Sequence, residues 1–173
     1  SSITTSNLVL SDGSSQFGVS FESQNRVVFS NNLVSGFQNT NISVSSHSDT
    51  VFLVNNNSMN VSGASAFQIN QGDKTILKNN IIQNANFGIS GFIGPVRSDY
   101  NLFNNVNIKV RAGAYLGDGN IIADPMFVND TLPILNGTYD LHLQKYSPAI
   151  NAGDPNILDA DGTRSDLGIY GGP

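Results

Sequence analysis

The sequence predicts an all-β solenoid, a parallel β-helix in which short strands and turns stack coil upon coil. Four strand-like segments recur about every 24 residues, beginning at Ile3, Val27, Val51 and Thr75. A second series runs between them and begins at Phe17, Ile42, Phe67 and Phe87. Self-similarity at this period is typical of solenoids, whose coils bury a core only by stacking on one another.

Within each repeat the apolar residues alternate with polar ones, which is the period of a β-strand. The alternation places Phe17, Val19 and Phe21 on one strand face, and it recurs at Ile42 and Val44. Each repeat holds three such pieces, so we expect about six coils of three short strands. Equivalent strands of successive coils should pair about 4.8 Å apart.

Asparagine pairs occupy matching turns of the repeats, at Asn31-Asn32, Asn55-Asn56 and Asn79-Asn80. Asparagine tolerates left-handed backbone, and stacked asparagine side chains can hydrogen-bond along a ladder. We therefore interpret the asparagine richness as structural. The sequence patterns of leucine-rich repeats and of glycine-rich calcium repeats are absent, so neither class is expected. Helical repeats are not expected either, because no long helical periodicity occurs.

The composition argues against nucleic acid, a membrane and a thiolate-bound metal as partners. Only 12% of the residues are charged, the net charge is -5, and the eight Lys and Arg residues are scattered, so nucleic acid is an unexpected partner. No apolar run approaches the roughly 20 residues that span a bilayer, so no membrane insertion is expected. The chain has no cysteine, which excludes disulfides and thiolate metal sites.

The regular repeat weakens after the fourth pair of segments. We expect regular coils over residues 1–105, with the last irregular coils and a C-terminal cap over residues 106–173, in one continuous domain. Because the repeat starts almost at the first residue, we also expect the chain to be part of a longer polypeptide. Its oligomeric state does not follow from the sequence.

Four C-terminal stretches resemble the end of right-handed parallel β-helix proteins found in exported bacterial multidomain chains. They are NIIADPMF (residues 120–127), YDLHL (139–143), SPAINAGDP (147–155) and DADGTRSDLGIYGGP (159–173). The resemblance covers the last third of the chain, and Ile169 stands where that family often has alanine.

This resemblance implies a right-handed coil and a location outside the cytoplasm, secreted or on the cell surface. The family shares its fold with pectate lyases, alginate lyases and epimerases. A shared fold does not imply a shared activity. The expected partner is an extracellular polysaccharide or a cell-surface glycan.

A loop near the C-terminus is the best chemical candidate, as a calcium site. Its oxygen ligands would be the carboxylates of Asp159, Asp161 and Asp166 and the backbone carbonyl of Thr163. Calcium favours six to eight such oxygens, and the loop does not follow the EF-hand pattern. The alternative is that Arg164 pairs with Asp161 or Asp166 and pins the cap.

A second group of polar residues falls on the stacked turns, at His47, Asp49, Asp73 and Lys74. Polysaccharide lyases and epimerases need a base for the sugar C5 proton and an acid for the leaving oxygen. These four residues are the weak catalytic candidates. The alternative is an exposed Asp49–Lys74 ion pair, which contributes little.

Two functions therefore follow from the sequence. The preferred one is a non-catalytic β-helix module, structural, adhesive or polysaccharide-binding. The alternative is the C-terminal part of a polysaccharide lyase or epimerase that acts on uronate-containing glycans. The non-catalytic interpretation is preferred because the coils offer no catalytic set that the sequence identifies.

Overall fold

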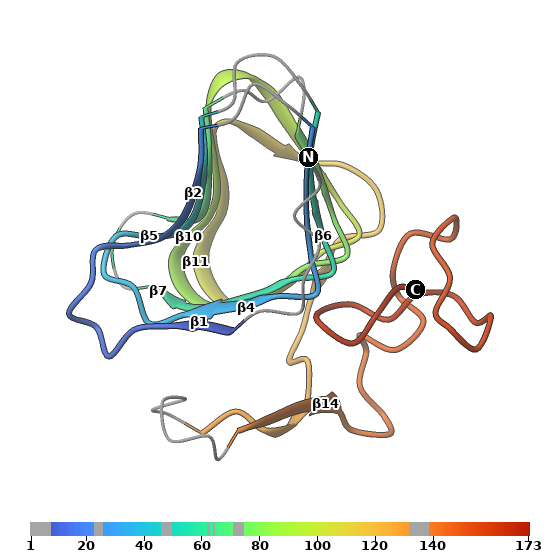
Figure 1. Ribbon diagram of the computed structural model, residues 1–173. Helices are drawn as coiled ribbons and strands as arrows, with labels where there is room; N and C mark the ends of the chain where they lie inside the picture. The colour runs from blue at the N-terminus through green and yellow to red at the C-terminus, as the bar shows by residue number, and fades with distance from the viewer. Residues whose placement is uncertain are drawn as a thin grey trace.

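The fold is a stack of three-strand coils, seen down the stack in Figure 1. The computed structural model describes residues 8–22, 26–45, 50–61, 63, 65–70, 75–131 and 139–173, and these contain strands and turns but no helix. The first three coils consist of β1 (Leu8–Leu10), β2 (Phe17–Phe21), β3 (Val27–Ser30), β4 (Leu33–Ser35), β5 (Thr40–Val44), β6 (Val51–Val54), β7 (Asn57–Val61), β8 (Ser65–Ile69) and β9 (Thr75–Lys78). Later elements are β10 (Ile81–Asp99), β11 (Leu102–Leu116), β12 (Ile121–Ile122), β13 (Phe127–Asn129) and β14 (Asp140–Leu143).

Every strand of the stack pairs in parallel with its equivalent in the next coil, which confirms the predicted solenoid. The register follows the sequence repeat, because Val27 pairs with Val51 and Val51 pairs with Thr75. β10 and β11 continue around the corners as single long strands. Between them the repeat is shorter, because Ile81 pairs with Leu102, 21 residues later. The stack makes about four turns, slightly fewer than the six coils expected. The last addition to the stack, β12, is only two residues long.

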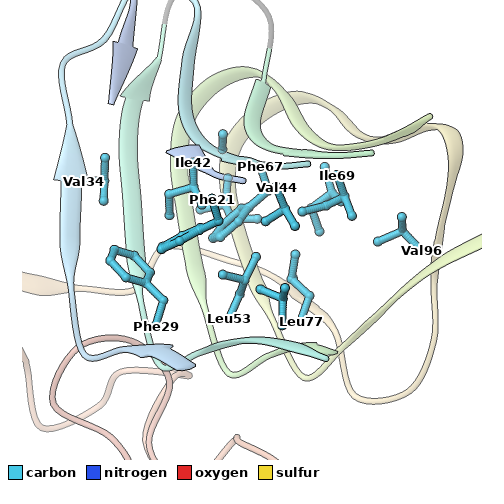
Figure 2. Packing of buried hydrophobic residues seen from close by; sticks show 14 of the residues in the cluster. Phe21, Phe29, Val34, Ile42, Val44, Leu53, Phe67, Ile69, Leu77 and Val96 are labelled. Atoms are coloured by element: carbon cyan, nitrogen blue, oxygen red, sulfur yellow. The ribbon is translucent and has the colours of Figure 1, made fainter. Parts of the chain in front are cut away.

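Apolar side chains fill the interior in columns, and each coil contributes one side chain to a column. Figure 2 shows this packing from close by. Ile42, Phe67 and Ile89 form one such column in register, and all three are fully buried. Phe17 was expected on the same face but is 57% exposed. Gly18 faces the core in its place, since a Cβ atom there would lie 3.0 Å from the side chain of Val34.

The predicted asparagine ladder lies inside the turns. It consists of the second asparagine of each pair and its later equivalents, namely Asn32, Asn56, Asn80, Asn101 and Asn120. The Oδ1 atoms of Asn56, Asn80 and Asn101 each accept hydrogen bonds of 2.8–3.1 Å from the backbone N–H and Nδ2 of the preceding ladder residue. The ladder satisfies buried turn backbone that would otherwise lose its hydrogen bonds to water.

Residues 147–173, here called the C-terminal strap, lie along the side of the coils rather than across the end of the stack (Figure 1). The strap follows the first asparagine of each pair, where Asn31, Asn55 and Asn79 have left-handed backbone with φ of 56–58°. Asn79 Oδ1 accepts the N–H of Asp154, and Asn31 Nδ2 donates to the carbonyl of Gly171. The strap therefore runs back from the third coil toward the first.

A second apolar cluster joins the strap and the β13–β14 hairpin to the outer face of the stack. From the coils it contains Leu33, Met59, Ile81 and Leu102, and from the C-terminal third it contains Phe127, Leu141, Ala149 and Leu167. The sheet that carries β4, β7 and the start of β10 is thus buried on both faces. Near-continuous apolar runs are typical of such strands.

Candidate functional site

The four weak catalytic candidates, His47, Asp49, Asp73 and Lys74, lie outside the described residues. Their predicted convergence is therefore not tested by the structure.

The predicted calcium loop, residues 159–166, is held together by its own hydrogen bonds. Asp159 uses both carboxylate oxygens, which accept the backbone N–H groups of Asp166 at 3.0 Å and Gly172 at 2.6 Å. Asp161 Oδ1 accepts the N–H and the hydroxyl of Thr163, and the Thr163 carbonyl accepts the N–H of Asp159. Local donors thus occupy both carboxylate oxygens of Asp159 and one oxygen each of Asp161 and Asp166.

The carboxylates of this loop still influence one another. Burial raises the pKa of Asp166, the N–H of Asn151 opposes that rise, and the charges of Asp159 and Asp161 add to it. No group of three or more His, Cys, Asp or Glu in the described part of the chain is arranged to hold a metal ion. Calcium binding stays a prediction, which a melting curve with and without chelator tests.

The alternative interpretation of this loop pairs Arg164 with Asp161 or Asp166, but the hydrogen bonds of Arg164 within the described residues go elsewhere. Its Nε donates to the carbonyl of Gly153 at 2.6 Å, and Nη2 donates to the carbonyl of Ala152 at 3.4 Å. Its guanidinium lies 5.7 Å from the ring centroid of Tyr100, which occupies the left-handed turn position of the fourth coil. Arg164 therefore pins the strap through backbone carbonyls and an aromatic face.

A groove of about 350 Å³ lies between the outer face of β3 and β6 and the C-terminal strap. Its floor consists of Val28, Phe52 and Val54, which point away from the core on alternate positions of their strands. Its wall is built by Ile157, Gly172 and Pro173. A groove of this volume can hold a small ligand or a single sugar unit.

Two polar groups of the groove have no partner among the described residues. The guanidinium of Arg26 lies 4.8 Å from the centroid of the Phe52 ring, and no described carboxylate forms an ion pair with it. The hydroxyl of Ser30 also lines the groove without a hydrogen-bond partner in this part of the chain. The groove thus combines an apolar floor with one cation and one hydroxyl.

Sequence reasoning missed this groove, although the sequence carries a signal for it. The segments Val27-Val28-Phe29 and Val51-Phe52-Leu53 are apolar at every position, including the one that faces outward. Apolar residues on both faces of a strand indicate that something covers its outer face. Only the course of the distant strap shows what forms the wall.

Outside the groove, a cluster of His142, Asp140 and Tyr170 joins the β13–β14 hairpin to the end of the strap. The ring of His142 stacks on that of Tyr170 with centroids 4.0 Å apart, and its Nδ1 lies 2.6 Å from Asp140 Oδ1. Hydrogen bonds from the backbone and then the side chain of His142 lower the pKa of Asp140. Burial raises the pKa of Tyr170. The stack is exposed and fastens the strap to β14.

Comparison of the chain with models of protein families, with curated proteins and with solved structures found no match. No helix among the described residues is long and apolar enough to cross a membrane.

Proposed function

We propose that this chain is a non-catalytic β-helix module, secreted or on the cell surface, that binds an acidic polysaccharide. The observation that carries the proposal is the groove beside Phe52, in which a guanidinium and a hydroxyl without partners among the described residues border an apolar floor. The location outside the cytoplasm rests on the resemblance of the C-terminal residues.

The groove matches the two sides of a uronate sugar. The C–H face of the ring would pack on Val28, Phe52 and Val54, and burying this apolar surface favours binding. Arg26 would bind the carboxylate through paired N–H donors, and Ser30 would bind a ring hydroxyl. Because the groove runs along the straight side of a stack, neighbouring sugars could extend along the coils.

The lining of the groove supports binding rather than catalysis. Among the described residues that line the groove, Arg26 is the only one with an ionisable side chain, and a guanidinium does not release its proton in proteins. A lyase needs a base that can remove the sugar C5 proton. The lyase alternative rests on His47, Asp49, Asp73 and Lys74, and it stays a prediction.

Affinity electrophoresis tests the proposal directly. The protein should be retarded in gels that contain polygalacturonate or alginate and not in gels that contain dextran, and added salt should weaken the retardation. Arg26→Gln should weaken binding about tenfold, because a hydrogen bond to a charged group contributes about 1.5–3 kcal/mol.

The matched control is Lys145→Gln, which removes an exposed cation that does not line the groove and should leave binding unchanged. Absence of retardation by every acidic polymer would refute the proposed function. Equal losses in both variants would instead indicate nonspecific charge attraction. Unsaturated sugar ends released from the polymer would favour the lyase alternative.

A further inference from the structure

The last full strand of the stack, β11, has one paired edge and one open edge. Along one edge β11 pairs with β10 from Leu102 to Leu116. Along the other edge β12 pairs only with Leu102 and Phe103. Within the described part of the chain, residues 104–116 have no strand on that side, because the C-terminal strap lies along the flank of the coils.

The open end also exposes apolar side chains. Ile108, Tyr115 and Leu116 of β11 are 47%, 46% and 42% exposed, and Ile122 of β12 is 69% exposed. An unpaired strand edge with apolar neighbours is a template for pairing with another strand. Solenoids normally cover such an end because it also exposes the core.

The open edge contains a straight segment that is symmetric in chemical character. Left-handed residues bound it on both sides, Asn105 with φ of 50° and Ala112 with φ of 56°. Between them, Val106 and Val110 flank Ile108 at equal distances, and both valines pack with the main core. Read from Ile108 in either direction, the order is polar, valine, polar.

The polar residues on the two sides of Ile108 are complementary. On the N-terminal side, Asn105 Nδ2 donates to Asn84 Oδ1 at 2.8 Å and Asn107 Nδ2 donates to Asn86 Oδ1 at 3.2 Å. Both amides therefore donate to the preceding coil, and no described residue donates to their oxygens. On the C-terminal side the equivalent positions are cations, Lys109 and Arg111. Arg111 Nε donates to Ser90 Oγ at 2.7 Å and its guanidinium lies over the Phe87 ring, so its remaining N–H groups are the ones that face a partner.

We propose that the open edge of β11 binds the same edge of a second copy of this chain, as an antiparallel pair with its two-fold axis at Ile108. Val106 then lies opposite Val110 of the second copy, so the two cores join. Asn107 lies opposite the second copy's Lys109, and Asn105 lies opposite its Arg111, so each cation meets free amide oxygens. A two-fold contact of this kind closes on itself and does not propagate into a fibre.

The register follows from charge as well as from the apolar pattern. A two-fold axis at Lys109 would place the two lysines directly opposite each other, and like charges opposed across an antiparallel pair are destabilising. The axis at Ile108 avoids that contact. The commitment to a second copy rests on this self-complementarity, which a partner of unrelated sequence would not need.

Mass measurement by light scattering during gel filtration tests the pairing. We expect a concentration-dependent species of twice the 18.4 kDa chain mass. Ile108→Lys should convert it to monomer by placing two cations at the axis. Ile122→Lys, an exposed apolar residue outside the paired segment, is the matched control and should still dimerise. Circular dichroism verifies that both variants fold.

Cross-linking tests the register without relying on loss of association. The chain has no cysteine, so Ile108→Cys introduces a single thiol beside its own copy at the axis. Antiparallel partners lie about 4.5–5.5 Å apart at Cα, a span that a disulfide can bridge. Mild oxidation should produce a disulfide-linked dimer from Ile108→Cys and not from Ile122→Cys. A wild-type protein that stays monomeric, or equal cross-linking at both positions, overturns the proposal.

Discussion

At the residue scale, adjacent asparagines in this chain have very different roles. Asn56 belongs to the inner ladder, and its Nδ2 donates to the carbonyls of Phe29 and Val54. Asn57 follows it directly, is fully buried, and has neither Nδ2 nor Oδ1 hydrogen-bonded within the described residues. It lies in register between Leu33 and Ile81 on the outer face of the sheet. An apolar column is therefore interrupted by one unsatisfied amide.

Asn57→Leu should stabilise the protein by about 1–3 kcal/mol, because it removes a buried amide without partners and extends an apolar column. Asn56→Leu is the matched control and should destabilise the protein, since two carbonyls and the next ladder step lose their partners. Urea unfolding of both variants measures the two effects. A loss of stability in Asn57→Leu would show that the amide has a partner in solution.

A buried ion pair ties the strap to β9 and links stability to pH. Lys78 Nζ lies 2.5 Å from Asp154 Oδ2, and the Asp154 side chain is 5% exposed. Burial alone would raise the pKa of Asp154, but hydrogen bonds from Lys78 and Asn156 outweigh burial and hold the pKa below its usual 3.8. A carboxyl with a lowered folded-state pKa stabilises above the unfolded value, and that stability is lost as pH falls through the folded pKa.

Asp154→Asn should therefore destabilise the protein at pH 7 and reduce the further loss of stability on acidification below pH 3.8. Asp166→Asn should stabilise the protein at pH 7, because the raised pKa of Asp166 means that its charged form destabilises the fold. In the wild type, protonation of Asp166 therefore adds stability as pH falls. Melting temperatures of the two variants and the wild type between pH 7 and pH 3 measure the contrast. Parallel pH profiles for all three proteins would contradict it.

At the element scale, the strap is positioned by close backbone packing. Gly168 has φ of +87°, and a Cβ atom there would lie 2.5 Å from Asn57 Oδ1 and 2.8 Å from Ile81 Cδ1. Its N–H donates to the carbonyl of Asn79 at 2.8 Å. The strap can approach the sheet this closely only because a glycine occupies the contact.

Gly168→Ala should loosen the strap, because the added methyl meets both a left-handed backbone and packed neighbours. Gly162→Ala is the matched control, since Gly162 has φ of +85° with nothing within 4 Å of its added Cβ. Both variants incur the backbone strain of about 1–2 kcal/mol, and only Gly168→Ala adds the packing penalty. Hydrogen exchange over residues 147–173 should rise more in Gly168→Ala. Equal exchange in both variants would locate the whole effect in the backbone.

At the scale of the whole molecule, stability is shared along a stack in which each coil contacts its neighbours. Solenoid stability is close to a sum of coil stabilities and nearest-neighbour interfaces. Asn80 stands in the middle of the ladder and Asn120 at its end, beyond which the described residues add no further step. The same substitution should therefore have a larger effect in the middle.

Asn80→Ala should lower the free energy of unfolding by more than about 2 kcal/mol, because it removes the donors to the Leu53 and Lys78 carbonyls and the acceptor for Asn56. Asn120→Ala removes bonds to the Ser98 and Gly117 carbonyls and to the Asn101 N–H, but it should cost less because Asn120 is only half-buried and water can replace those bonds. Urea unfolding followed by circular dichroism gives both values. A larger loss in Asn120→Ala would show that stability resides at the end of the stack.

How far the sequence predicts the site differs from residue to residue. The outward Phe52 is visible as an apolar position between two inward ones, yet its partner in the groove, Ile157, lies about 100 residues later. The sequence identifies the Asp159 carboxylate as a candidate metal ligand, but in the structure it accepts the N–H groups of Asp166 and Gly172. Oxygen-rich spacing alone cannot distinguish metal ligands from acceptors of backbone N–H groups.

The sequence by itself determines the coil, because a strand-period pattern repeated about every 24 residues can bury its apolar side chains only by stacking. It also determines the asparagine ladder, which requires only that equivalent turns coincide. The tertiary structure alone decides where the strap lies and that β11 keeps an edge that no described strand covers. The strap contacts join residues up to 140 positions apart, such as Asn31 and Gly171, and no local periodicity encodes such a separation.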